Sequence, residues 1–311
     1  MIKKLLITIV VPFFNEESGI AMFYRALNEE LSKNPHYKFE VICIDDGSSD
    51  NTLELLVELS KNDSRLRVIE FSRNFGKEAA LSAGLDLALG DAVIPMDADL
   101  QDPPSLISEL INTWVTSNPD VVLARRIDRS SDTLSKRLSA SLFYDAHNWV
   151  SQIKLPANVG DCRLMNRQVV EALKFLPEKQ RFMKGLFAWV GFKTITINYV
   201  RDKRYEGKTK FSLWRLWNFA LEGFTSFSTW PLRVWTYVGM LGALISMSYG
   251  LFIIFRTLIN GNDVPGYSSI LVSILFFGSL QLIGLGVLGE YVGRIYMESK
   301  KRPTYLIRKT H

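Results

Sequence analysis

The sequence predicts an α/β fold with a mainly parallel, Rossmann-like sheet, followed by a membrane-associated helical region. Apolar runs rich in Ile and Val alternate with helical patterns at least four times in residues 1–211, which is typical of a parallel sheet with right-handed crossovers. Polar residues follow four successive runs, at the points where strands end. Residues 230–295 are almost wholly apolar, and this change in composition marks the main domain boundary.

Five apolar runs predict the first strands, because continuous stretches of this kind are expected where a strand is covered on both faces. They are residues 5–12, 39–44, 67–71, 92–96 and 120–124. Apolar residues at helical spacing predict helices between them. After Arg125 the pattern changes. The sequence then predicts helices at 134–150, 168–175 and 178–189 and strands at 158–165 and 192–200.

The loops after the first four strands, 12–17, 45–50, 72–77 and 97–102, are expected to meet at one edge of the sheet, where open α/β sheets bind ligands. In the last loop, Asp97 and Asp99 lie on the same side of an extended segment. Two carboxylates this close repel each other unless a positive charge lies between them. A hard divalent cation with oxygen ligands suits the pair. A turn of solvated aspartates is the alternative.

The apolar region predicts attachment to a membrane. Residues 212–229 are amphipathic and contain two tryptophans, which favours a helix in the headgroup plane, with ordinary core packing as the alternative. Residues 234–254 and 267–289 carry no charge, and each is long enough to span a bilayer. The predicted domains are therefore 1–211 (α/β domain), 212–229 (juxtamembrane helix), 230–295 (two-helix transmembrane hairpin) and 296–311 (basic tail).

Charge and cysteine content exclude several classes of function. The net charge is +5, but Lys and Arg are scattered apart from concentrations at 201–215 and 300–309, which flank the apolar region. Anionic lipid headgroups explain such a rim better than nucleic acid does, and the basic tail assigns both termini to the cytoplasm. Cys43 and Cys162 are far apart, and the three histidines lack ligand spacing, so we expect neither a disulfide framework nor a zinc site.

Four motifs carry a resemblance to a known family. They are IVVPFFNE at 9–16, DDGSSD at 45–50, NFGK at 74–77 and DADLQDPP at 97–104. In this order they resemble the GT-A, family 2 glycosyltransferases. More narrowly, they resemble the polyprenyl-phosphate glycosyltransferases, which include dolichyl-phosphate mannose synthases and bacterial bactoprenol glucosyltransferases of O-antigen modification. The resemblance extends over essentially the whole chain, and the length and tail are most similar to the bactoprenol glucosyl type.

The resemblance implies a role for each matching residue. The nucleotide-sugar-binding residues would be Pro12, Phe14, Glu16, Ile44, Asp46, Lys77, Asp97, Ala98, Arg125, Arg204 and Lys210. Asp97, Asp99 and Gln101 would hold Mg²⁺ or Mn²⁺. The lipid phosphate would be bound by Arg137, Arg204 and Lys210. The catalytic residues would be Asp99, Asp161, Arg204 and Lys210. For the basic loop 201–210, a solvated linker is the alternative.

The resemblance implies transfer of one sugar, with glucose from UDP-glucose favoured, to undecaprenyl phosphate with inversion. A mannose or aminoarabinose synthase using another nucleotide sugar is an alternative, and a non-catalytic membrane-anchored nucleotide-binding scaffold is another. The chain has Glu178-x-x-Arg181-Phe182 where processive synthases carry Gln-x-x-Arg-Trp, which favours a single transfer. We expect a multi-pass protein of the inner (cytoplasmic) membrane, with its catalytic domain in the cytoplasm. Glycines in the apolar region permit close helix packing in a homo-oligomer.

Overall fold

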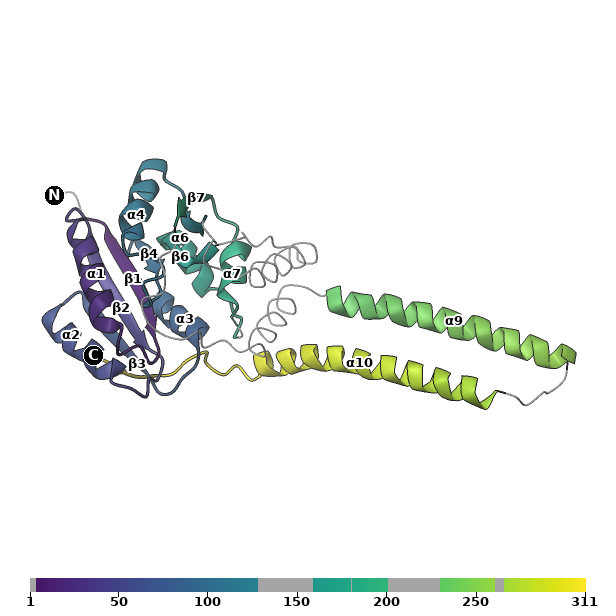
Figure 1. The fold of residues 1–311 in the computed structure, drawn as a ribbon. Coiled ribbons are helices and arrows are strands. Elements are labelled where there is room, and N and C mark those ends of the chain that lie inside the picture. The colour runs from purple at the N-terminus through teal and green to yellow at the C-terminus, as the bar shows by residue number, and fades with distance from the viewer. Residues whose placement is uncertain (1–3, 128–158, 180, 201–229, 261–265) are drawn as a thin grey trace.

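The computed structural model describes residues 4–127, 159–179, 181–200, 230–260 and 266–311. These residues form one eight-stranded sheet with helices on both faces, and a pair of long helices that extends away from it (Figure 1). The strands are β1 (Leu6–Phe13), β2 (Lys38–Asp45), β3 (Leu66–Phe71), β4 (Ala92–Pro95), β5 (Val121–Arg126), β6 (Val159–Asn166), β7 (Thr194–Tyr199) and β8 (Ile307–Thr310). All seven predicted strands are confirmed.

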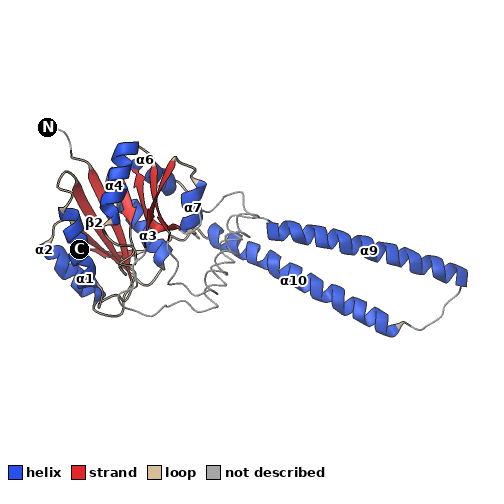
Figure 2. Cartoon of the chain, turned by 45° about the horizontal axis from the view of Figure 1, so that its top comes forward, coloured by secondary structure: helices blue, strands red, loops and turns tan. Residues whose placement is uncertain are grey.

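The helices cover both faces of the sheet, because alternate residues of each strand point to opposite sides (Figure 2). Side chains of α1, α2 and α4 pack on one face, and side chains of α3, α6 and α7 pack on the other. The helix bounds are α1 (Ile20–Ser32), α2 (Thr52–Asn62), α3 (Lys77–Leu87), α4 (Leu106–Ser117), α6 (Arg167–Lys174), α7 (Met183–Trp189), α9 (Trp230–Asn260) and α10 (Tyr267–Ser299).

The order of the strands explains where the functional loops lie. The order is β7-β5-β6-β4-β1-β2-β3-β8, and the four consecutive strands β4, β1, β2 and β3 are parallel neighbours. Pro12 pairs with Ile44, and Ile44 pairs with Ile69, so these strands end almost level. The loops that follow them therefore converge at one edge, as predicted from the sequence.

Two strands of this mainly parallel sheet run antiparallel to their neighbours. β6 is antiparallel to β4 and to β5, and β8 is antiparallel to β3. β6 begins beside the end of β5, where Val159 pairs with Arg125, so it must run back along the sheet. As a consequence Asp161, near the start of β6, lies at the same edge as the carboxyl ends of the parallel strands.

In the second half of the chain, the observed helices differ in length from the predicted ones. The helix predicted at 178–189 begins only at Met183, because Arg181 donates hydrogen bonds to the main-chain oxygens of Leu176 and Glu178 in a preceding turn. The predicted helices 134–150 and 212–229 lie outside the described residues. The second apolar helix, α10, continues to Ser299, well beyond residue 289.

One of the two predicted membrane spans meets the expected length and composition in the described residues. This segment is Phe276–Ser299, which has a mean hydropathy of 1.3 and is not buried inside the protein. The apolar stretch Tyr237–Phe252 of α9 is shorter. Large apolar side chains of both helices are exposed, including Leu258 at 80% and Leu282 at 71%. The span predicted at 234–254 stays a prediction.

The carboxyl-terminal segment joins the sheet. The sequence assigned 296–311 to a basic tail, but Ile307–Thr310 form β8 against the outer edge of β3. The Tyr305 ring stacks on Phe71, with centroids 5.3 Å apart, and its hydroxyl donates to Asp86 Oδ2 at 2.8 Å. Arg308 pairs with Glu70, 3.1 Å away. Aromatic stacking and an ion pair thus attach β8, a short and exposed strand, to the sheet.

We expect Tyr305→Ala to detach β8 and to lower the free energy of unfolding by about 2 kcal/mol, because it removes a stacked ring and a hydrogen bond to a carboxylate. Thermal unfolding and the rate of tryptic cleavage near residues 300–302 measure this effect. Tyr305→Phe keeps the ring, so its loss in free energy of unfolding should be less than half of that in Tyr305→Ala. Equal losses in the two variants would contradict a role for stacking.

Candidate functional site

The loops after β1 and β2 are joined by hydrogen bonds. Asn15, which has a left-handed φ of 53°, donates from its main-chain nitrogen to Ser48 Oγ at 3.0 Å, and its Oδ1 accepts from Ser49 N at 2.8 Å. Glu16 N donates to Thr52 Oγ1 at 2.9 Å. These bonds hold the first two motifs side by side at the edge of the sheet.

Asp46 connects the second motif to the third. It is 3% exposed, and its two carboxylate oxygens accept from Phe75 N at 2.7 Å and Gly76 N at 2.9 Å. Burial raises the pKa of Asp46, and these two main-chain donors partly offset that rise. Gly47 beside it has φ of 66°, and a Cβ there would lie 2.5 Å from the main chain of Arg73, so only glycine fits.

Lys77 lies between two carboxylates at the centre of the site. Its Nζ is 2.6 Å from Asp97 Oδ1, at the end of β4, and 2.6 Å from Asp161 Oδ2, near the start of β6. Lys77 is the first residue of α3, and its side chain is 43% exposed. The sequence places Lys77 among the nucleotide-binding residues, whereas the structure shows it as the cation that joins the DADLQD motif to Asp161.

The pKa values of Asp97 and Asp161 shift in opposite directions, because burial and nearby charges balance differently at the two carboxylates. Burial raises the pKa of Asp97, and the nearby charges of Asp161 and Asp99 add to that rise, against the effect of Lys77. Burial also acts to raise the pKa of Asp161, but the ammonium groups of Lys77 and Lys184 outweigh it and hold this pKa below its usual range. Asp161 is therefore ionised at neutral pH and is a weak base.

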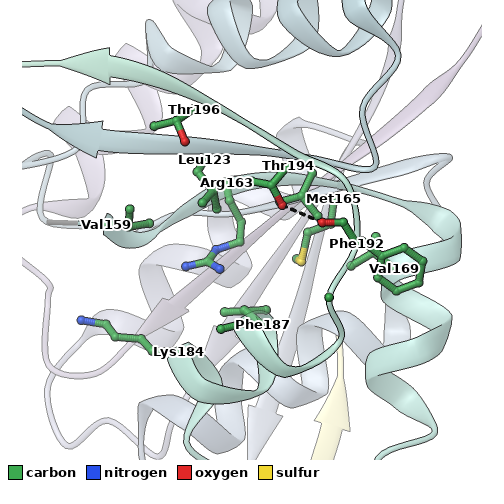
Figure 3. A pocket seen from close by; sticks show the side chains of 13 residues that line it. Leu123, Val159, Arg163, Met165, Val169, Lys184, Phe187, Phe192, Thr194 and Thr196 are labelled. Atoms are coloured by element: carbon green, nitrogen blue, oxygen red, sulfur yellow. Dashed lines mark hydrogen bonds between the residues drawn. The ribbon is translucent and has the colours of Figure 1, made fainter. Parts of the chain in front are cut away.

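A cavity of about 370 Å³ adjoins this cluster on the α7 side of the sheet (Figure 3). Strands β5, β6 and β7, helices α6 and α7 and the segment after α7 supply its lining. Most of that lining is apolar, and the charged ends of Arg163 and Lys184 lie on the same side of it. The cavity is thus apolar with a basic end directed toward the turn that carries Asp161.

Arg163 supports that turn from within the protein. It is 5% exposed, and it donates from Nη2 to Gly160 O at 2.7 Å and from Nε to Asp161 O at 3.3 Å. Its guanidinium carbon is 4.0 Å from the centroid of the Phe187 ring. Burial lowers the pKa of Arg163 to about 10, so it stays charged at neutral pH. Arg163 was not among the site residues predicted from the sequence, although it follows Asp161 in the pattern Gly-Asp-x-Arg.

Asp97 and Asp99 of the DADLQD motif fit a divalent cation. In the described part of the chain, no three His, Cys, Asp or Glu side chains form a metal-ligating cluster by themselves. Asp97 and Asp99 are close enough for the charge of Asp99 to raise the pKa of Asp97. Because Mg²⁺ typically takes one or two carboxylates plus substrate phosphates, this oxygen donor set suits a cation completed by a diphosphate.

The other predicted site residues lie in varied positions. Pro12, Glu16 and Ala98 are half-buried, and Phe14 is 37% exposed, all near the same edge. The Ile44 side chain is fully buried in the core.

Arg125 is exposed and donates from Nε to Asn198 Oδ1 at 3.0 Å, on the β7 side of the site. Gln101 is half-buried, and its main-chain nitrogen donates to Asp99 Oδ1. Arg137, Arg204 and Lys210 lie outside the described residues.

Comparison with known proteins identifies the family. Residues 8–174 match Glycosyl transferase family 2. The chain is 54% identical to the SfII prophage-derived bactoprenol glucosyl transferase of Shigella flexneri, with 98% of each chain covered. It is 52% identical to the prophage bactoprenol glucosyl transferase homolog of Escherichia coli K12, over 97% of this chain and 98% of that one.

A solved structure with similarity is glucosyl-3-phosphoglycerate synthase from Mycobacterium tuberculosis. It is 21% identical, with a TM-score of 0.46, over 71% of this chain and 78% of that one. The family match covers all four motifs and β1 through α6. The chain belongs to glycosyltransferase family 2, and the resemblance of its motifs to the polyprenyl-phosphate glycosyltransferases of that family is confirmed.

Proposed function

We propose that the protein transfers glucose from UDP-glucose to a polyprenyl phosphate, giving a lipid-phosphate-linked glucose for modification of a cell-surface polysaccharide such as O-antigen. The observation that carries this proposal is the 54% identity to a bactoprenol glucosyl transferase over 98% of both chains. The geometry supports it, since the motifs meet at the edge where α/β sheets bind nucleotides.

The transfer needs a stabilised leaving group. The bond from the anomeric carbon to the UDP oxygen breaks, UDP leaves with the electron pair, and an oxygen of the lipid phosphate forms the new bond. Attack from the opposite face inverts the anomeric configuration. A divalent cation, Mg²⁺ or Mn²⁺, held by Asp97, Asp99 and Gln101 would neutralise charge on the diphosphate. Arg204 and Lys210 would add positive charge there.

We propose that Asp161 orients the acceptor rather than removing a proton. A general base works best when its pKa lies near the operating pH, and the contact with Lys77 holds the pKa of Asp161 far below that. A phosphate monoester has a second pKa near 6, so the acceptor is largely ionised without a base. Lys77 would then fix Asp161 while Arg125 and Arg137 face phosphate groups.

The apolar helices give this reaction a location. We propose that α9 and α10 are two membrane spans with both termini in the cytoplasm, and that residues 212–229 lie in the headgroup plane. The exposed apolar side chains of α9 and α10 support the first point. The domain would then face polyprenyl phosphate at the cytoplasmic surface of the inner membrane, where glycine-rich helix faces also allow a homo-oligomer.

The test is incubation of membranes that contain the protein with undecaprenyl phosphate and a panel of radiolabelled sugar nucleotides, followed by lipid extraction. We expect label in the lipid fraction with UDP-glucose and none with membranes carrying Asp97→Ala. If the lipid is instead labelled from GDP-mannose or from an aminoarabinose donor, the transferred sugar is mannose or aminoarabinose and not glucose. No labelled lipid with any donor, together with metal-dependent UDP binding, would identify a non-catalytic scaffold.

A further inference from the structure

Asp102, the last residue of loop 97–102, is buried against the edge strand β7, which lies three places from β4 in the sheet. It is 3% exposed. The hydroxyl of Tyr199 donates a hydrogen bond to Asp102 Oδ1 at 2.5 Å. Tyr199 is the last residue of β7, the edge strand, and is itself 8% exposed. A buried carboxylate is costly without such a partner, so this contact fixes the end of the loop.

The backbone within the loop is strained. Leu100 has φ of 56°, which is a left-handed conformation that branched and bulky residues rarely adopt. Asp99 Oδ1 accepts from Gln101 N at 3.2 Å across this turn, and the side chains of Ala98 and Leu100 pack on the core. Strain of this kind persists only where the surrounding structure holds both ends of the segment. β4 holds one end of this loop, and Asp102 is at the other.

The Asp102 carboxylate also lies against the turn that carries Asp161. A Cβ at Gly160 would be 3.5 Å from Asp102 Oδ2, so the main chain of Gly160 is beside this carboxylate. Burial raises the pKa of the Cys162 thiol, and the charge of Asp102 adds to that rise, which places Asp102 close to β6. Asp102 therefore contacts structure on both sides of the site.

We infer that Asp102 and Tyr199 are positioning residues that hold the metal-binding loop in register with the Asp161 turn. This hydrogen bond and the contact of Asp102 with Gly160 connect three parts of the site. These are the loop with Asp97 and Asp99, the start of β6, and the end of β7, which directly precedes the segment containing Arg204 and Lys210. The nature of the bound cation and nucleotide rests on the proposed function, whereas the positioning of the loop does not.

Tyr199→Phe tests this inference with two measurements. The first is hydrogen–deuterium exchange of the metal-free protein, in which we expect the amides of residues 97–102 to exchange about tenfold faster. The second is UDP binding titrated with Mn²⁺ in the absence of lipid acceptor. We expect the Mn²⁺ concentration for half-maximal binding to rise about tenfold, because a hydrogen bond to a buried charged group is lost.

Tyr24→Phe is the matched control. The Tyr24 hydroxyl donates to Asp63 Oδ2 at 3.1 Å, near the amino-terminal end of β3 and away from the site. We expect this variant to leave both measurements unchanged, even where its thermal midpoint falls. Equal changes in the two variants would overturn the inference, as would unchanged exchange in Tyr199→Phe.

Substitutions at Asp102 keep the inference testable if Tyr199→Phe does not fold. Asp102→Asn retains an acceptor oxygen, so the amides of residues 97–102 should exchange within about threefold of the wild-type rate. In Asp102→Ala they should exchange about tenfold faster than in the wild type. Equal exchange in the two Asp102 variants would overturn the role of the hydrogen bond. If the wild type binds no UDP with Mn²⁺ while exchange responds as expected, the proposed donor is wrong and the positioning role stands.

Discussion

Asp97→Ala is expected to lower kcat/KM for lipid-linked glucose formation on the order of 10³-fold, because it removes a carboxylate that would hold the divalent cation and also frees Lys77. Most of the loss should appear in kcat, since the charge on the leaving group grows in the transition state. Initial rates at varied UDP-glucose and metal concentrations measure it. Excess metal should restore little activity, because the missing ligand cannot be replaced by mass action alone.

Asp91→Ala is the control for this prediction. Asp91 lies just before β4, at the other end of the same strand, where its Oδ2 accepts from Leu6 N at 2.8 Å. Loss of this carboxylate should reduce the stability of the protein and leave kcat/KM within about twofold of the wild-type value. An Asp97→Ala enzyme with turnover near that of the wild type would remove the metal assignment from Asp97.

Asp161→Asn is expected to lower kcat on the order of 10²-fold with little change in KM for UDP-glucose. The substitution keeps the shape of the side chain but removes the charge that pairs with Lys77 at 2.6 Å. If Asp161 orients the acceptor, the rate should fall by a similar factor at every pH from 6 to 8. A general base whose pKa lies within that range would instead give the wild type an additional rise in rate with pH that the variant loses, beyond the rise that ionisation of the acceptor phosphate gives to both enzymes.

Asp120→Asn is the control for Asp161→Asn. Asp120 lies beside the far end of β6, where its Oδ1 accepts from Asn166 Nδ2 at 2.9 Å. This variant should retain its turnover. Nearly full turnover in Asp161→Asn would exclude Asp161 from the mechanism, and the Lys77 contact would then serve only to order the metal-free site.

The sequence predicted the edge at which the site lies because parallel strand direction follows from alternating strands and helices. It did not predict the partner of Lys77. Asp161 reaches that ammonium group only because β6 runs antiparallel to β4, and no local pattern in residues 158–165 distinguishes the two directions. The resemblance implied a catalytic role for Asp161, but its ion pair with Lys77 depends on the tertiary fold.

Two other features had no sequence signal. Asp102 and Tyr199 are 97 residues apart, and an aspartate that ends a turn ordinarily faces solvent. The strand Ile307–Thr310 has one apolar residue among basic and polar ones, which is also the composition of a solvated tail. In both cases the decisive contact is long-range. Tyr305 stacking on Phe71 could not be inferred from the residues around either ring.

The pairing of β8 with β3 also affects how the protein can be shortened. β7 and β8 are the two edge strands of the sheet, and the long helices lie between them in the chain. A truncation that removes α9 and everything after it therefore also removes β8, and it leaves the N–H and C=O groups of β3 that face away from β2 unpaired. Open strand edges promote pairing between molecules. A soluble form suited to crystallisation would need residues 303–311 rejoined to the domain through a linker.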